Sequence, residues 1–250
     1  MSKAKKIVIT VIAVLLVLAL AAWFFVPRIM LYAGSKAILS NIGEAATYFT
    51  EYDIRNENVQ AIDNGHIAID IPAEYVKKDL DLEHNAVYYD PDTNLSIYFM
   101  GERDMSEMNL IKEENFSEKL TDNKLDIGTK QLIKGFEALG NGLPDCGYNT
   151  YKCIRLLDKE DNSFWNFNQA AAFLVTGTLK EISAASGTEQ IYESDDICGF
   201  VSYTSRDDGT YRVGLEIYRT DDLNTVSTVI LTVENLEDAY AVMNSARASE

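Results

Sequence analysis

The chain has few of the residues that most often bind metals or act as general bases. Among its 250 residues are two histidines and three cysteines. His66 and His84 have no companion at metal-ligand spacing, and the sequence has no H-E-x-x-H motif. Cys146, Cys153 and Cys198 contain no C-x-x-C pair, so neither a zinc cluster nor a redox pair is indicated. We therefore predict no metal site and expect both histidines to be exposed surface residues.

The usual motifs of nucleotide-binding and hydrolytic enzymes are also missing. The sequence has no P-loop and no G-x-S-x-G elbow. Gly140 and Gly142 lack the third glycine and the preceding strand of a dinucleotide fingerprint. A Ser–His–Asp or Cys–His site built from distant residues stays open, because its members meet only in space. The sequence thus nominates no catalytic residue and no cofactor, and it favours a protein without enzymatic activity.

Basic residues are scarce beside acidic ones. The chain has 22 Lys and Arg against 39 Asp and Glu, a net charge of −17 at pH 7. Four basic residues and no acidic ones precede residue 29, so the remainder carries 22 − 4 = 18 basic against 39 acidic residues, a net −21. Such a surface repels nucleic acid and anionic lipid headgroups, which excludes nucleic acid as a partner. We interpret the charge as a solvated surface; a site for a basic partner is the alternative.

Charge is absent altogether from residues 7–26, which read IVITVIAVLLVLALAAWFFV. A helix of about 20 apolar residues, rising ~1.5 Å per residue, spans a hydrocarbon core of about 30 Å. We predict a transmembrane anchor at residues 7–26, with membrane lipid as its partner. A signal peptide cleaved after Ala21 is the alternative, but the apolar run continues through Trp23 to Val26. No cysteine follows the run, so a bacterial lipid anchor is not available there.

The charges that flank this run predict its orientation. Lys3, Lys5 and Lys6 precede it and only Arg28 follows closely, so the N-terminus should stay in the cytoplasm. We expect four parts: a cytoplasmic N-terminus (1–6), the anchor (7–26), a helical stalk or interfacial segment (27–52) and an acidic extracytoplasmic domain (53–250). Pro27 marks the expected membrane edge, and the stalk is predicted from near-helical spacing of Leu31, Ile38, Ile42, Ala45 and Phe49. The protein would then be a single-pass protein of the cell membrane.

Strands dominate the domain that follows. The stretch NVQAIDNGHIAIDIP predicts a hairpin at Asn64-Gly65, with alternate isoleucines from Ile67 to Ile71 on one face and His66 on the other. A second hairpin is predicted in AVYYDPDTNLSIYFM. Strands at 197–205, 211–219 and 225–233 should form an antiparallel meander, followed by a helix opened by Glu237 and Asp238.

The middle of the chain is predicted to be mainly helical. We expect a loop at 101–122, then a helix capped by Asn123 and ending at Gly140, with its apolar stripe at Leu125, Leu132, Phe136 and Leu139. Residues 148–157 predict a strand, 158–162 a turn, and the stretch WNFNQAAAFLVTGTLKEISA a helix. The fold class is therefore α+β: an antiparallel sheet with flanking helices, preceded by one N-terminal transmembrane helix.

Three segments together resemble the PsbP/Mog1-type sandwich. They are a strand ending in proline (IAIDIPAEY), a hairpin (AVYYDPDTNLSIYF) and a closing strand–strand–helix unit (YRVGLEIYR, VSTVILTV, LEDAYAVMNSA). The resemblance covers residues 60–246 and implies an α-β-α sandwich. No binding motif of that family matches here residue by residue, so the resemblance implies no function.

Two acidic stretches have part of the spacing of a calcium loop. Asp90, Asp92 and Asn94 are followed by Leu95 and Gly101 where that loop needs Gly and Glu. A second stretch fails in the same way, with Ser163 and Gln169 after its acceptors Asp158, Glu160 and Asn162. Asp and Asn are common turn formers, so we interpret both stretches as turns.

Cysteines and aromatic residues leave two questions open. Cys146 and Cys153 flank a turn-like stretch and are the best disulfide partners, while three buried unpaired thiols are the alternative. Four tyrosines are expected on strand positions opposite the core face: Tyr88, Tyr98, Tyr203 and Tyr218. Covered by helices they would be core residues; uncovered, they would form a patch for protein or glycan binding, as would Trp165 and Phe167.

The function favoured by these observations is that of a membrane-tethered extracytoplasmic domain, acting as a binding or accessory module for a ligand or protein of the cell envelope. The alternatives are an envelope hydrolase with a spatially assembled site, which would need a histidine near a Ser, Cys or carboxylate, and a ligand sensor. Only six residues precede the apolar run, too few for a signalling domain, so a sensor would act through a membrane partner.

Overall fold

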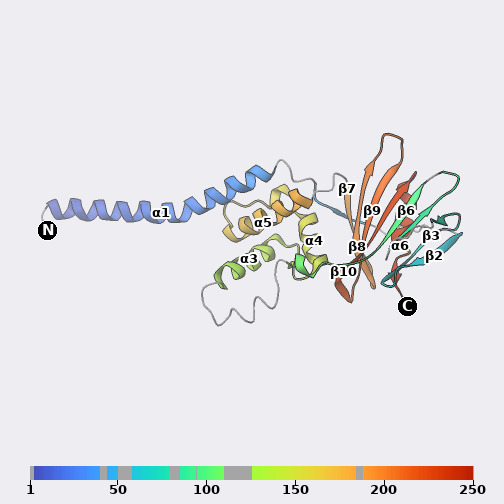
Figure 1. The fold of residues 1–250 in the computed structure, drawn as a ribbon. Coiled ribbons are helices and arrows are strands. Elements are labelled where there is room, and N and C mark those ends of the chain that lie inside the picture. Colours follow the sequence, from blue (N-terminus) through green and yellow to red (C-terminus); the bar gives the residue numbers. More distant parts are fainter. Residues whose placement is uncertain are drawn as a thin grey trace.

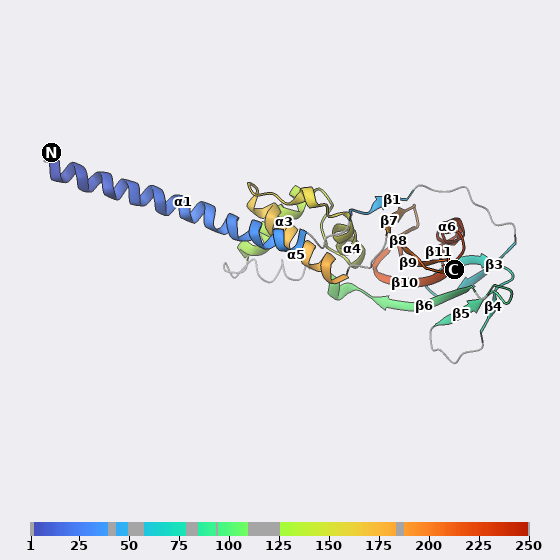
Figure 2. The same ribbon diagram turned by 90° about the horizontal axis from the view of Figure 1, so that it is seen from above.

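The computed structural model describes residues 3–39, 44–49, 58–78, 85–93, 95–109, 126–183 and 188–249. Its fold is α+β, as the sequence predicts: a long N-terminal helix, a group of shorter helices beside the end of that helix, and a sheet domain beyond them (Figure 1). Figure 2 shows the same succession from a second direction, with the start of the long helix and the sheets at opposite ends.

The N-terminal helix α1 runs from Lys3 to Leu39 and contains Pro27. Within it, Val14–Lys36 is long and apolar enough to cross a membrane, and none of its most apolar window is buried against the protein. Pro27 does not break the helix, and the segment beyond it is helical as predicted up to Leu39. Ala45 and Phe49, predicted to continue this helix, lie instead outside any helix, on either side of the short strand β1 (Thr47–Tyr48), and Ile42 lies outside the described residues.

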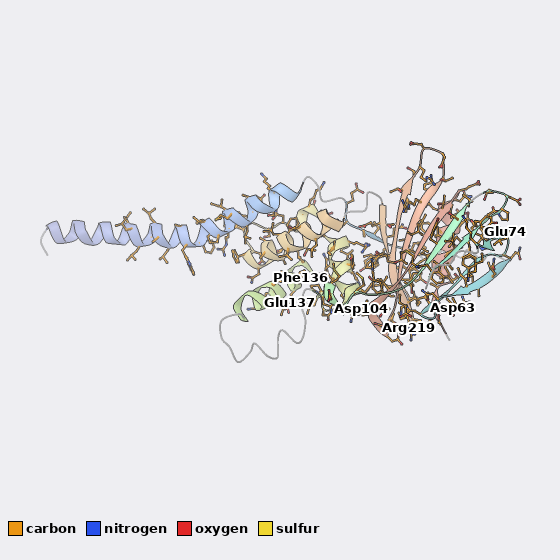
Figure 3. All side chains as sticks on the ribbon, in the orientation of Figure 1. Asp63, Glu74, Asp104, Phe136, Glu137 and Arg219 are labelled. Carbon is orange, nitrogen blue, oxygen red and sulfur yellow. The ribbon has the colours of Figure 1, made fainter. Side chains whose placement is uncertain are left out.

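Three helices form what we call the helical unit: α3 (Asp126–Leu139), α4 (Gly147–Leu156) and α5 (Phe167–Ser183). α3 and α5 confirm the two helices predicted there, and Gly140, at a φ of 76°, ends α3. The unit has its own small core of Phe136, Cys153 and Ala172, one residue from each helix. Figure 3 shows Phe136 in the helical unit, away from the sheets.

The predicted strand at 148–157 is wrong, because these residues form α4. Cys146 has extended backbone and its Sγ accepts a hydrogen bond from Asn149 N at 3.4 Å, so it serves as the N-cap. Thr150, Cys153 and Ile154 have the i, i+3, i+4 spacing of one helix face, and all three are buried. The aromatic and β-branched residues of this segment suit a strand locally, but burial against both α5 and the sheet selects the helix.

The main sheet has eight strands in the order β1-β7-β8-β9-β10-β6-β5-β4, and all neighbours are antiparallel except β1 and β7. Its other strands are β4 (Val76–Lys77), β5 (Ala86–Tyr89), β6 (Ser96–Asp104), β7 (Thr188–Glu193), β8 (Ile197–Ser205), β9 (Tyr211–Arg219) and β10 (Asp222–Val233). The predicted hairpin β5–β6 and the meander β8–β9–β10 are confirmed. Residues 101–104, predicted as loop, extend β6, because they pair with β10 as far as Asp104 opposite Thr225. A short 3-10 helix, η1 (Ser106–Met108), follows.

A smaller sheet covers one face of the main sheet. It has the order β11-β3-β2, with β2 (Val59–Asp63) and β3 (Ile67–Pro72) forming the predicted hairpin and β11 (Arg247–Ala248) beside β3. The predicted C-terminal helix is α6 (Leu236–Asn244). Between these elements and the main sheet lies the principal core, whose members include Ile69, Phe99, Leu215, Val229 and Met243.

The opposite face of the main sheet, which we call the outer face, is covered at one end by α4. There the Tyr148 ring stacks on the Phe200 ring with centroids 5.1 Å apart, and Tyr218 is fully buried beside them. Both faces of β8, β9 and β10 are therefore apolar at this end of the sheet.

Candidate functional site

The turn between β2 and β3 packs against β6 and β10 of the main sheet. His66 Nδ1 lies 3.0 Å from Ser227 Oγ, and Asn64 Nδ2 donates to the same hydroxyl at 3.0 Å. His66 is 6% exposed and Ser227 is fully buried. The prediction that His66 is an exposed surface residue is therefore wrong, because the hairpin folds its turn against the main sheet. His84 lies outside the described residues.

Local sequence shapes this turn. Asn64 Oδ1 accepts hydrogen bonds from His66 N at 3.1 Å and Ile67 N at 2.9 Å, and Gly65 takes a φ of 90°. Asp63, at the end of β2 (Figure 3), accepts a hydrogen bond through Oδ1 from Ser249 Oγ at 2.7 Å. The C-terminal segment thus helps to hold the turn that presents His66.

An irregularity in β6 completes the contact. Ser227 pairs with Glu102 and Val229 pairs with Phe99, so β6 has one more residue than β10 between these two pairs. This is a β-bulge, and Met100 O within it accepts a hydrogen bond from Asn64 Nδ2 at 3.1 Å. No motif in the sequence signals this cluster, since its members come from three separate strands or turns.

The chemistry of the cluster is limited by burial. Burial lowers the pKa of His66, against the opposite influence of Glu102 and Asp222, so the imidazole is neutral at pH 7. A neutral imidazole beside a hydroxyl is the arrangement of a base and a nucleophile. Ser227, however, has no exposed surface that a substrate would reach. As it stands, the cluster joins the small sheet to the main sheet.

A second polar cluster joins the helical unit to the outer face. Arg155 Nη2 lies 2.7 Å from Glu216 Oε2, its Nε lies 3.5 Å from Glu189 Oε1, and its guanidinium lies 4.1 Å from the Phe200 ring centroid. Lys180 Nζ, almost fully buried, donates to three backbone carbonyls, including Leu157 O at 2.9 Å. Burial lowers the pKa of Lys180. Two of its three bonds go to carbonyls at the end of α4, Arg155 O and Leu157 O, and the third goes to Glu44 O before β1.

All three cysteines are buried and unpaired, so the disulfide alternative for Cys146 and Cys153 is not realised. Burial raises the pKa of Cys153 and of Cys198 to about 12. Thiols of this kind are poor nucleophiles at neutral pH, because the reactive species is the thiolate. They act here as small apolar residues.

Both calcium-like stretches form turns, as predicted. The Asp90 carboxylate accepts hydrogen bonds from Asp92 N at 2.9 Å and from the Thr93 hydroxyl, while Asn94 lies outside the described residues. Asp158 caps the 3-10 helix η2 (Lys159–Asp161) by accepting from Glu160 N at 3.0 Å. Among the described residues, no group of three or more His, Cys, Asp and Glu side chains is placed to hold a metal ion.

The four tyrosines have different positions. Tyr218 is buried under α4, whereas Tyr98 on β6 is 49% exposed on the outer face. Tyr88 and Tyr203 were predicted to face away from the core, and that prediction is wrong. Both pack against the principal core, since they lie opposite the buried Ile97 and Val213 in the sheet register. Outside the sheets, Trp165 is 72% exposed beside the helical unit, and Phe167 begins α5.

No protein-family model matches this chain, and no curated protein matches it either.

Proposed function

We propose that this protein is a single-pass, membrane-tethered module whose sheet domain lies outside the cytoplasm and binds a partner or ligand of the cell envelope. The observation that supports it best is α1, one helix from Lys3 to Leu39 whose most apolar window makes no buried contact with the rest of the protein. An apolar helical surface of this length is unfavourable in water and favourable in a bilayer.

The helical unit supports the tethering function by fastening the sheet domain to the anchor. The part of α1 from Arg28 to Gly34 contacts α5, and α5 in turn contacts α3 and α4. Arg155 O at the end of α4 accepts a hydrogen bond from Ala46 N at 2.9 Å, next to β1. In this reading, these contacts keep the sheet domain at a defined distance from the bilayer.

The side of the membrane follows from the flanking charges. Three lysines precede the apolar part of α1, and we assign this end to the cytoplasm on the positive-inside rule. The sheet domain then lies on the opposite side.

A row of residues on the outer face is the surface we assign to partner binding. Tyr98 is 49% exposed and Met100, two positions along the same face of β6, is 41% exposed. In the sheet register, Tyr98 pairs with Ile230 on β10, and Ile230 pairs with Gly214 on β9. Gly214 has no side chain to rise above the sheet next to Ile230. Exposed aromatic residues and methionine are enriched at protein interfaces.

The His66 cluster gives little support to the alternative that this protein is a hydrolase. The histidine does meet a serine, which is the juxtaposition that alternative needs, but Ser227 is fully buried and shares its hydroxyl with Asn64. We therefore assign these residues to the packing of the two sheets.

Cysteine labelling in intact cells tests the topology. Ser2→Cys places a thiol before the apolar segment, and Asp208→Cys places one in the exposed turn between β8 and β9, where the Asp208 side chain is 53% exposed. The three native thiols are buried and should give little background. A membrane-impermeant maleimide should label Asp208→Cys in intact cells and Ser2→Cys only after lysis. The opposite pattern, or release of a shortened chain by carbonate, would refute the tethered orientation.

Cross-linking from the outer face tests partner binding. A photoreactive amino acid at Tyr98 should give a discrete adduct in intact cells, and the same group at Asp208 should not. If Tyr98 and Met100 both give no adduct in native membranes, this face does not bind a partner.

A further inference from the structure

The exposed Trp165 lies in a stretch without charge. From Asn162 to Leu179 the sequence contains no Asp, Glu, Lys, Arg or His, in a chain of which 24% of residues are charged. Trp165 is 72% exposed, and its ring packs edge-on against Phe164 with centroids 5.1 Å apart. Exposing a large apolar side chain to water to this extent is unfavourable in free energy, whereas a contact with apolar groups would be favourable.

Contacts with α1 show where this stretch lies along the helix. Asn162 Oδ1 accepts a hydrogen bond from Ser35 Oγ at 3.0 Å. Two residues later, the Phe164 ring lies 5.7 Å from the Tyr32 ring. The partner on α1 thus moves from Ser35 toward the apolar end as the chain advances.

The start of α5 continues and then reverses this course. Phe167 lies nearest the apolar end, with its ring centroid 5.7 Å from the Arg28 guanidinium. From there α5 returns in the same direction as α1, because Leu174 faces Gly34. The chain therefore runs along α1 toward the apolar segment, turns at 164–167 and runs back along α1. Trp165 lies in that turn.

The level of the turn corresponds to the edge of the predicted span. Arg28 is two residues beyond Val26, about 3 Å at ~1.5 Å per residue. Away from α5, Ile29 and Met30 are 54% and 70% exposed, so the apolar surface of α1 extends at least to this level. The Arg28 guanidinium lies 3.6 Å from the Phe24 ring centroid and donates a hydrogen bond to Phe24 O at 2.7 Å, so the first charge after the apolar run stays close to the end of that run. Trp and Tyr concentrate at this depth because one part of the ring is apolar and another forms hydrogen bonds.

We propose that the turn at 164–167, led by Trp165, inserts into the membrane interface as a second contact between this protein and the bilayer. The inference rests on the proposed tethering by α1. The partner surface is the zwitterionic phospholipid interface, since the stretch has no basic side chain to select anionic lipid. One helix alone leaves a domain free to tilt and rotate; a second contact beside it holds the sheet domain in one orientation above the membrane.

The two tryptophans of the chain allow a direct test. Trp23→Phe leaves Trp165 as the sole tryptophan, and Trp165→Phe leaves Trp23. Each full-length variant is reconstituted into phosphatidylcholine vesicles with bromine placed either near the carbonyl end or near the terminus of the acyl chains. Both residues are highly exposed, at 79% and 72%, so neither substitution should disturb folding, which circular dichroism checks.

Trp165 should lose most of its emission to bromine near the carbonyl end and little to bromine near the chain terminus. The loss should persist in high salt and with added phosphatidylglycerol, because the contact is not electrostatic. If Trp165 emission is unaffected by either lipid while Trp23 is quenched, the second contact is refuted and the tether stands. An emission shifted to the blue without quenching identifies a protein covering and refutes lipid contact. If neither tryptophan is quenched, the tethering itself fails.

Discussion

Asn64 and Ser227 are separated by 163 positions in the sequence, and their side chains are joined by a hydrogen bond of 3.0 Å. With His66 Nδ1 at 3.0 Å from the same hydroxyl, this pair joins the β2–β3 turn to the centre of the main sheet. The stability of the sheet domain should depend on it.

Ser227→Ala should therefore destabilise the protein by about 1–3 kcal/mol, because it leaves buried His66 Nδ1 without its partner. Urea unfolding of the full-length chain in detergent micelles measures the change. Ser202→Ala is the matched control, since Ser202 is half-buried and its longer bond to Gly214 O is 3.4 Å. The control should stay within about 0.5 kcal/mol of wild type. Equal effects of the two substitutions would show that the Ser227 cluster contributes no special stability.

The same cluster predicts a pH dependence. Burial holds the pKa of His66 in the folded protein below the ordinary histidine value of 6.5, so the contribution of His66 to stability is fully present above pH 6.5. As the pH falls below that value, the unfolded chain binds the proton before the folded one does, and stability is lost. Between about pH 8 and about pH 5, wild type should lose more stability than the non-titrating variant His66→Asn. Parallel pH profiles for the two proteins would contradict a neutral, buried His66.

The contact between α3 and α5 predicts a strong effect at one glycine. A Cβ on Gly135 would lie 2.2 Å from Asn168 O and 2.8 Å from Ala172 Cβ. Gly135→Ala should therefore force the helices apart and cost about 1–3 kcal/mol, measured as a lower Tm. Gly34→Ala on α1 is the control, because its Cβ would meet Leu174 at an ordinary 3.8 Å. That variant should keep or slightly raise the Tm, since alanine favours a helix more than glycine does. The reverse order of the two Tm values would contradict this packing.

Thiol chemistry tests the buried cysteines. With the pKa of Cys153 and Cys198 raised to about 12, a thiol reagent at about pH 8 should modify the native protein very slowly. After denaturation without reductant, all three cysteines should react. Recovery of a single reactive thiol would instead reveal a disulfide.

Local patterns predict much of the sheet because its strands carry their own signals. Asn64-Gly65 between alternating runs predicts the β2–β3 hairpin, and the runs from 197 to 233 predict β8, β9 and β10. The helix α4 is predicted wrongly because its aromatic and β-branched residues, such as Tyr148, Thr150 and Tyr151, are typical of a strand. What selects a helix is contact with α5 and with Phe200, which no local window contains.

The candidate site lies almost entirely beyond sequence prediction. His66 looks like a surface residue because it follows a turn and alternates with the buried isoleucines. It is buried because the β2–β3 turn packs against the bulge in β6 and the hydroxyl of Ser227. The sequence of the turn cannot predict a bulge in a different strand. The exposure of Tyr98 and the burial of Tyr218, on the same face, likewise depend on where α4 ends.

The sequence by itself determined the α+β class, the apolar helix, the two hairpins β2–β3 and β5–β6 and the meander β8–β9–β10, because these follow from runs and alternations of neighbouring residues, whose hydrophobic and conformational preferences act locally. Tertiary structure alone decided that His66 is buried, that the cysteines stay apart, and that Phe164 and Phe167 lie beside α1. Each of these depends on the distance between residues far apart in the chain, and that distance is set by the packing of whole elements rather than by any one of them.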